Sequence, residues 1–260
     1  MARGERWVPA TAIHRPGSTR PSTATRCASW RATDQAPRVR HPPERARVKA
    51  AAYSTEDLDV ARSRRLDVRA GESFANILVE STVPLGPVPG FEHGSPSTSY
   101  KVRADSFRVD LLMPTSGSDV RTMPVPELAA HATGLPFLAY LLEDPIEAIA
   151  LAREVVVPIV VPRPEAFAWH KVLVSRLRGA TREKQYKDLH QAAVLFAVLA
   201  VDAPDAIESA FRAMPRGTRT RTREGIAALR PLLEDAGHER AIEVLETAVL
   251  SKNPLRRASS

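Results

Sequence analysis

Two aspartates stand two positions apart in the stretch STEDLDVARS, and a third follows about fifty residues later in FRVDLL. Residues i and i+2 of an extended chain project from the same face, so Asp57 and Asp59 can point together while Leu58 and Val60 enter the core. Asp110 supplies a third carboxylate if its strand pairs with this one. The competing interpretation is an ordinary acidic turn, because two aspartates at this spacing are common in loops.

Carboxylates this close to one another repel, and the repulsion raises a carboxyl pKa unless a divalent cation lies between the charges. Oxygen ligands suit Mg²⁺ or Mn²⁺. These ions clamp nucleotide phosphates and lower the pKa of an attacking hydroxyl. The three aspartates therefore predict a metal site for phosphoryl chemistry on a nucleoside triphosphate (NTP).

Strands must position these carboxylates. FANILVEST, residues 74–82, is predicted as an apolar strand, and the segment after it is a loop dense in Pro, Gly and Ser. In YKVRADSFRVDLLMP, residues 100–114, apolar and polar residues alternate with the two-residue period of a hairpin or a long bent strand ended by Pro114. Asp110 falls on the face opposite Val109 and Leu111.

The second half of the chain has a helical pattern. LPFLAYLLEDPIEAIAL predicts a short helix leading into a strand, and EVVVPIVVP predicts a further strand, at an edge or with a bulge because Pro158 lacks an N–H. PEAFAWHKVLVSRLRG has Pro at a helix start and Gly179 near its end. Further helices are predicted at 204–214, 223–236 and 238–250.

Between them, REKQYKDLHQAAVLFAVLAV predicts a helix of about five turns. Its buried stripe is Leu189, Ala192, Ala193, Phe196, Leu199 and Ala200. A second face, at three- and four-residue spacings, carries Lys184, Lys187, Asp188 and Gln191. The predicted fold is thus α/β (α+β), with a small mixed sheet over residues 51–163 and a helical region over residues 164–252.

The basic charge is confined to the first fifth of the chain. Residues 1–50 carry 11 Lys or Arg against 3 acids, whereas the other 210 residues carry 26 against 27. Six prolines and four Val, Ile, Leu or Phe residues in the leader predict a disordered segment. It is either a nucleic-acid-binding arm or targeting peptide, or a mistranslated leader. Nucleic acid is expected as a partner only through this leader.

Composition excludes several classes of site. The single cysteine, Cys27, can form no internal disulfide and no thiolate zinc site, which favours a reducing compartment. No apolar run reaches the roughly 18 to 20 residues that span a bilayer, and the N-terminus lacks a secretory signal. We expect a cytoplasmic protein with no membrane partner.

TEDLDV followed by FRVDLL resembles the aspartate pattern of the DNA polymerase beta nucleotidyltransferase superfamily. PIVVPRPEAFAWHKVLVSRLR and REKQYKDLHQAAVLFAVLA resemble a bacterial family of this fold, and the resemblance spans roughly residues 52–235. It implies that Asp57, Asp59 and Asp110 are catalytic metal ligands, with Asp110 also activating the acceptor. It further implies that the nucleotide side is lined or braced by His170, Lys171, Lys184, Lys187 and Asp188.

Other interpretations of these residues stay open. Lys184 and Lys187 also fit a solvated helical face, and His170 also fits a structural histidine beside Trp169. Lys171 follows an apolar run at a helix start, where a cation could reach phosphates bound over the strand ends.

One departure from the superfamily concerns the phosphate-binding helix. The superfamily carries a Gly-Gly or Gly-Ser motif about ten residues before its paired aspartates, whose backbone amides hold phosphates. Here that place is taken by HPPERARVKAAAYS, which has no glycine. A shifted reading frame of GC-rich DNA would produce such a leader. We therefore expect either Mg²⁺-dependent transfer of a nucleoside monophosphate to an unidentified acceptor, or a degenerate interaction module, as in toxin and antitoxin pairs.

Overall fold

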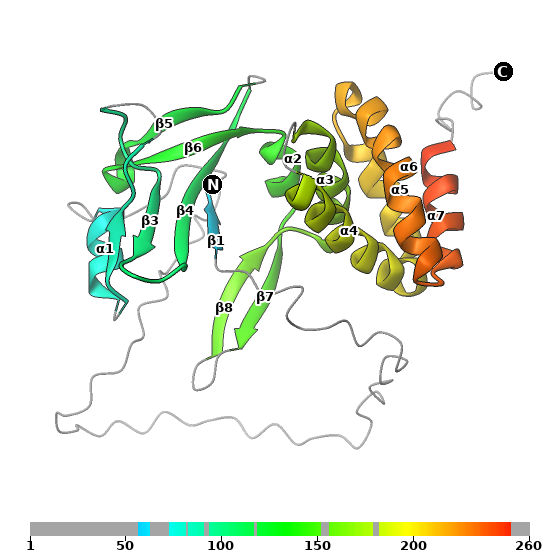
Figure 1. Cartoon of the computed structure of the whole chain (residues 1–260), viewed down its shortest axis with the longest axis horizontal. Coiled ribbons are helices and arrows are strands. Elements are labelled where there is room, and N and C mark those ends of the chain that lie inside the picture. Colours follow the sequence, from blue (N-terminus) through cyan, green and yellow to red (C-terminus); the bar gives the residue numbers. More distant parts are fainter. Residues whose placement is uncertain are drawn as a thin grey trace, which may run out of the picture. The chain divides into compact units, whose positions relative to one another are not determined.

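The computed structural model describes residues 57–62, 73–81, 83–90, 94–116, 119–151, 156–178 and 182–250 (Figure 1). The predicted basic leader and the glycine-free segment before Asp57 lie outside these residues.

A mixed sheet holds the first part of the described chain. Its strands follow the order β2-β3-β4-β6-β5, and β1 pairs with β4 outside this path. The β1–β4 and β4–β6 pairs are parallel, and the other pairs are antiparallel. The strands are β1 (Asp57–Ala61), β2 (Leu85–Pro87), β3 (Ser99–Val102), β4 (Arg108–Thr115), β5 (Arg121–Val125) and β6 (Ala130–Pro136). The predicted small mixed sheet is confirmed.

The β3–β4 hairpin follows the predicted alternation. Its turn places Ala104 at φ 63°, and Phe107 N–H donates to Asp105 Oδ1 at 3.1 Å. Val109 and Leu111 are buried, whereas Asp110 between them is only partly buried, so the predicted face of Asp110 is confirmed. β4 continues one residue beyond Pro114.

The predicted strand at 74–82 is wrong, because Phe74–Glu80 forms the helix α1. The Ser73 side chain caps this helix by accepting from Asn76 N–H at 3.1 Å. Phe74, Ile77 and Leu78, at the i, i+3, i+4 spacing of a helix, pack into the sheet core. The cap and this spacing together outweigh the strand propensity of the run.

β2, β5 and β6 lie in segments for which no strand was predicted. β6 consists largely of small residues, and Ala130 and Ala132 are buried in the same core as Phe74 and Tyr100. Small residues have low strand propensity, so the alternation in β6 is a weak signal without its neighbouring strands.

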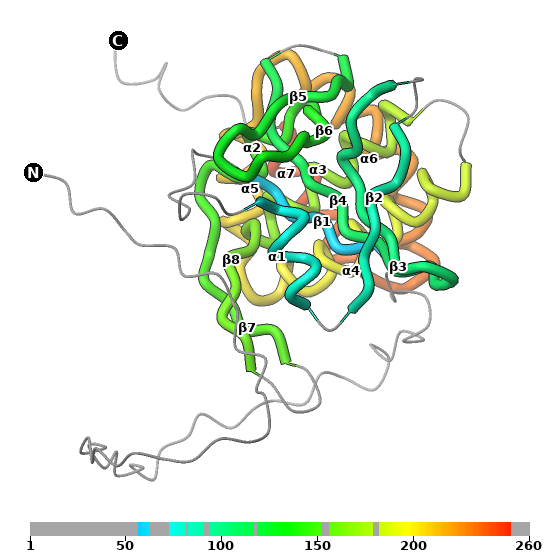
Figure 2. Tube along the Cα trace, turned by 90° about the vertical axis from the view of Figure 1, so that its left-hand side faces the viewer, coloured from blue at the N-terminus to red at the C-terminus, as the bar shows by residue number. Residues whose placement is uncertain are grey.

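A short helix, α2 (Leu138–Leu142), and two strands, β7 (Ile146–Leu151) and β8 (Val156–Val161), occur where they were predicted. The two strands pair with each other in a separate ribbon, which was not predicted (Figure 2). Pro158 pairs in register with Ile149. Each strand of the ribbon has one outer edge, where a missing N–H costs no ladder hydrogen bond, in agreement with the predicted edge position.

The rest of the described chain is helical: α3 (Pro164–Leu177), α4 (Arg182–Asp202), α5 (Pro204–Ala213), α6 (Arg219–Asp235) and α7 (Glu239–Leu250), with 3-10 turns at Pro126–Leu128 and Arg216–Thr218. The predicted helices are confirmed, although α6 begins four residues earlier than expected. Gly179 lies outside the described residues. No helix in the described ranges is both long and apolar enough to cross a bilayer.

The helices pack around Trp169 of α3. Its ring lies 4.8 Å from those of Phe196 and Phe211, and its Nε1–H donates to Ile207 O at 2.9 Å. All six residues of the predicted α4 stripe are buried. Gly225 of α6 lets this helix approach α3, because a Cβ at this position would lie 2.5 Å from Val172 Cγ1.

Candidate active site

The three predicted aspartates meet on one face of the β1–β4 pair. The parallel register places Asp59 opposite Asp110 and Asp57 opposite Arg108. Since side chains two residues apart share a face, all four groups project from the same side of the two strands. The strand pairing that the sequence analysis required is therefore present.

The expectation that Leu58 and Val60 enter the core is wrong, because they are 50% and 37% exposed. Within the described residues β1 pairs only with β4 and contributes no residue to the sheet core. β1 thus carries its aspartates on the margin of the sheet, where solvent and ligands have access to them.

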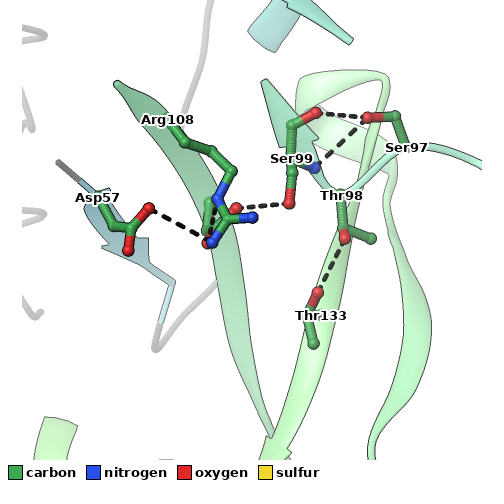
Figure 3. Close-up of polar contacts among 7 residues, drawn as sticks. Asp57, Ser97, Thr98, Ser99, Arg108 and Thr133 are labelled. Atoms are coloured by element: carbon green, nitrogen blue, oxygen red, sulfur yellow. Dashed lines mark hydrogen bonds and ion pairs between the residues drawn. The ribbon is translucent and has the colours of Figure 1, made fainter. Parts of the chain in front are cut away.

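Arg108 belongs to the same cluster, although the sequence analysis did not single it out. Its Nη2 lies 3.3 Å from Asp57 Oδ1 and its Nε lies 3.3 Å from Asp110 Oδ2. Figure 3 shows this side chain turned toward Asp57. The available signal was its position two residues before Asp110 on an alternating strand. Arg108 therefore bridges two of the three carboxylates.

Hydroxyl groups of Ser97, Thr98, Ser99 and Thr133 form a second polar group on β3, the segment before it and β6 (Figure 3). Ser99, opposite Asp110 in the β3–β4 register, donates its Oγ–H to Asp110 Oδ1. Ser97 Oγ–H in turn donates to Ser99 O at 2.6 Å. Thr133 Oγ1–H donates to Thr98 Oγ1 at 2.8 Å, which joins β6 to the segment before β3. Asp110 is thus the most firmly held of the three carboxylates, and its side chain is 18% exposed against 47% for Asp57.

Asp59 experiences the repulsion expected of a carboxylate cluster. Burial raises its pKa, and the negative charges of Asp110 and Asp57 raise it further. The positive charges of Lys171 and Arg108 act in the opposite direction and are outweighed. The residue is exposed as a whole, but its neighbours partly shield the carboxyl from water. Three acids and one guanidinium leave an excess of negative charge that a cation would neutralise.

A second charged cluster joins α3 to α4. Asp188 is 3% exposed, accepts a hydrogen bond from Lys171 Nζ at 3.0 Å, and forms an ion pair with Arg178, whose Nε lies 2.7 Å from Asp188 Oδ2. Lys171 also lies 5.1 Å from the centre of the Phe167 ring. Arg178 was missed by the sequence analysis, although it follows Lys171 by two helical turns. Asp188 thus braces two cations, and Lys171 carries its charge within electrostatic reach of Asp59.

The other predicted nucleotide-side residues lie in different environments. His170, beside Lys171 in α3, is only partly buried as a residue, but desolvation of its ring is the main reason why its pKa falls to about 4. Its Nδ1 has no hydrogen-bond partner among the described residues. Lys184 and Lys187 are exposed on α4, whereas Asp188 of the same helix is buried. The structure brings Lys171 and Asp188 together and leaves the two α4 lysines on the surface.

The donor set fits a magnesium-type ion in its chemistry. The three side chains offer carboxylate oxygens on one face, and their mutual repulsion is visible at Asp59. As the side chains are placed, no group of three or more His, Cys, Asp or Glu in the described part of the chain is arranged to hold a metal ion. Two of the three carboxylates are engaged by Arg108 instead.

Comparison with known proteins identifies a family but no individual relative. A family model described as Nucleotidyltransferase matches residues 42–215, more than half of the chain. The match includes every residue of the two charged clusters, and it begins upstream of β1. No curated protein and no solved structure matches with significant similarity. The resemblance seen in the sequence is thereby confirmed, and the chain belongs to this nucleotidyltransferase family.

Proposed function

We propose that this nucleotidyltransferase moves a nucleoside monophosphate from an NTP to an acceptor, with Mg²⁺ or Mn²⁺ bound by Asp57, Asp59 and Asp110. The observation that supports this most directly is the register of β1 on β4, which gathers three carboxylates on one face within the segment matched by the family. A bound ion would neutralise phosphate charge and lower the pKa of the attacking hydroxyl.

The protein's own groups then have distinct tasks. Asp110, held by Ser99, is the candidate acceptor of the proton from the attacking hydroxyl. The acceptor oxygen forms a bond to the α-phosphorus, the bond from that phosphorus to the bridging oxygen breaks, and pyrophosphate leaves. Lys171, kept in place by Asp188 and close enough to act on Asp59, is the candidate cation for the phosphates.

Nucleotide binding by the full chain tests this proposal. Calorimetry with each of the four NTPs, with and without Mg²⁺, should show Mg²⁺-dependent binding of at least one of them. Asp57→Asn and Asp110→Asn should each weaken that component at least tenfold, about 1.4 kcal/mol, because each removes a charged metal ligand. Asp144→Asn is the matched control, since Asp144 is an exposed aspartate paired with Arg163. Equal effects of all three variants would refute the assignment of the site.

The second candidate function is a degenerate nucleotidyltransferase fold that binds a protein partner, as in toxin and antitoxin pairs. The observation that favours it is Arg108, which already pairs with two of the three carboxylates. The glycine-free segment before Asp57 agrees with it. This function predicts no NTP binding at all by folded full-length protein, with or without Mg²⁺, so the same titration separates the two candidates.

A further inference from the structure

The guanidinium of Arg108 forms ion pairs with two carboxylates on the shared face of β1 and β4. It reaches across the strand pair to Asp57 and along its own strand to Asp110, at 3.3 Å in each case. Both carboxylates are ligands in the function proposed above. A divalent ion at these carboxylates would be repelled by the guanidinium that pairs with them, because both are cations and Arg offers only donors.

We propose that Arg108 is a resident counter-cation which competes with the divalent ion for Asp57 and Asp110, so that the site takes up metal readily only when an anionic nucleotide draws Arg108 away. This inference rests on the proposed function and adds a control of metal entry to it. The triphosphate offers oxygen acceptors that match the planar fork of a guanidinium. Metal and nucleotide should therefore bind cooperatively, and part of that coupling should come from Arg108.

Two features make Arg108 displaceable. Its contacts of 3.3 Å are longer than the 2.7–2.9 Å typical of a charge-assisted hydrogen bond, and its Nε makes no hydrogen bond within the described structure. The Arg108 side chain is also 41% exposed, so its charge can move into solvent at modest cost. Arg178 differs in the length of its contact, because its Nε lies 2.7 Å from the buried Asp188, although that Nε also makes no hydrogen bond within the described structure.

Arg108 also reduces the repulsion among the three acids on this face. Its charge opposes the repulsion that acts on Asp59. The same charge lowers the attraction of the site for any other cation. The two ion pairs of Arg108 are partly exposed to solvent, so we expect them to weaken metal binding about tenfold. Arg108 therefore stabilises the carboxylates before metal binds and weakens the binding of metal in the absence of nucleotide.

The test is Mn²⁺ binding to full-length protein, followed by the electron paramagnetic resonance signal of free Mn²⁺. Without nucleotide, Arg108→Gln should bind Mn²⁺ about tenfold more tightly than wild type. Arg163→Gln is the matched control, because Arg163 is equally exposed and pairs with an aspartate outside the site, and it should leave the affinity unchanged. With a non-hydrolysable NTP analogue present, the difference between wild type and Arg108→Gln should shrink to less than threefold.

Arg108→Lys provides a second variant if Arg108→Gln does not fold. A lysine ammonium is a compact charge that cannot bridge two carboxylates as a fork does, so this variant should bind Mn²⁺ more tightly than wild type. Measurable Mn²⁺ binding of equal strength in wild type and in the folded Arg108 variants would overturn the inference and leave the proposed function standing. Absence of Mn²⁺ binding in all of them would overturn both.

Discussion

The two charged clusters of this protein are built on opposite principles. The β1–β4 cluster has three acids and one guanidinium, is partly exposed, and leaves Asp59 with a raised pKa. The α3–α4 cluster surrounds one buried acid, Asp188, with two cations. A buried acid that is fully paired with cations serves the fold, whereas accessible acids that outnumber their cations are available to a ligand. Lys171 belongs to both clusters, because it pairs with Asp188 and its charge also acts on Asp59.

The largest effect on stability is expected at Asp188. Asp188→Asn removes the charge that compensates Lys171 and Arg178 and should lower the free energy of unfolding by about 3 kcal/mol. Urea denaturation at neutral pH measures this change. Asp144→Asn, at an exposed ion pair, should cost less than about 1 kcal/mol. Equal losses of stability in the two variants would show that Asp188 contributes no more to the fold than an exposed ion pair does.

The next effect is a pH dependence of stability that comes from His170, the neighbour of Lys171 in α3. The pKa of His170 is about 4 in the folded protein against 6.5 for a histidine in water, so the unfolded chain binds the proton first as the pH falls. The contribution of neutral His170 to the free energy of unfolding is therefore fully present above pH 6.5. As the pH falls from 6.5 to 4, this contribution decreases by at most about 1.4 kcal/mol per pH unit. His170→Gln should flatten this part of the curve of unfolding free energy against pH. Identical slopes in the two proteins would contradict the prediction.

A smaller effect of opposite sign is expected in the aspartate site. The pKa of Asp59 is raised in the folded state, so its charged form opposes folding and stability falls as the pH rises through that pKa. Asp59→Asn should therefore raise the free energy of unfolding at pH 7 without metal, by less than about 1 kcal/mol because solvent screens the charges. Thermal denaturation in the presence of a metal chelator measures this change in stability. A loss of stability in Asp59→Asn would show that the three carboxylates do not repel one another.

The contrast also explains what could be predicted from the sequence. Local periodicity identified the long helices, the β3–β4 hairpin and the buried stripe of α4, because each depends on residues close in the chain. Asp110 was found because it lies on an alternating strand. The place of Arg108 could not be predicted in the same way, since it depends on the parallel register of β1 on β4 across about fifty residues.

Burial was the second property that the sequence did not reveal. Asp188 and Lys187 are adjacent in the chain and both belong to the predicted polar face of α4, yet one is buried and the other exposed. The difference comes from the packing of α3 on α4, which brings Lys171 and Arg178 to Asp188. In helix α1 the deciding signal was local: the Ser73 cap favours a helix and outweighed the apolar run, which predicts a strand.

The smallest effect is expected at Lys184 and Lys187, which sharpen the comparison because they lie on the helix of Asp188 without sharing its burial. Replacing both by Ala should change the free energy of unfolding by no more than about 0.5 kcal/mol, as is usual for exposed positions. If they lie on the nucleotide side, as the family resemblance implies, the affinity for the NTP identified by calorimetry should fall several-fold in the double variant. Long-range attraction between exposed charges is screened by salt, so this loss should be greatest at low ionic strength and should fade at 0.5 M salt.

Lys171→Met should lose affinity at both salt concentrations, because its charge is partly buried at Asp188. An unchanged affinity in the double variant would remove the two α4 lysines from the nucleotide side and leave Lys171 as the cation that links the clusters.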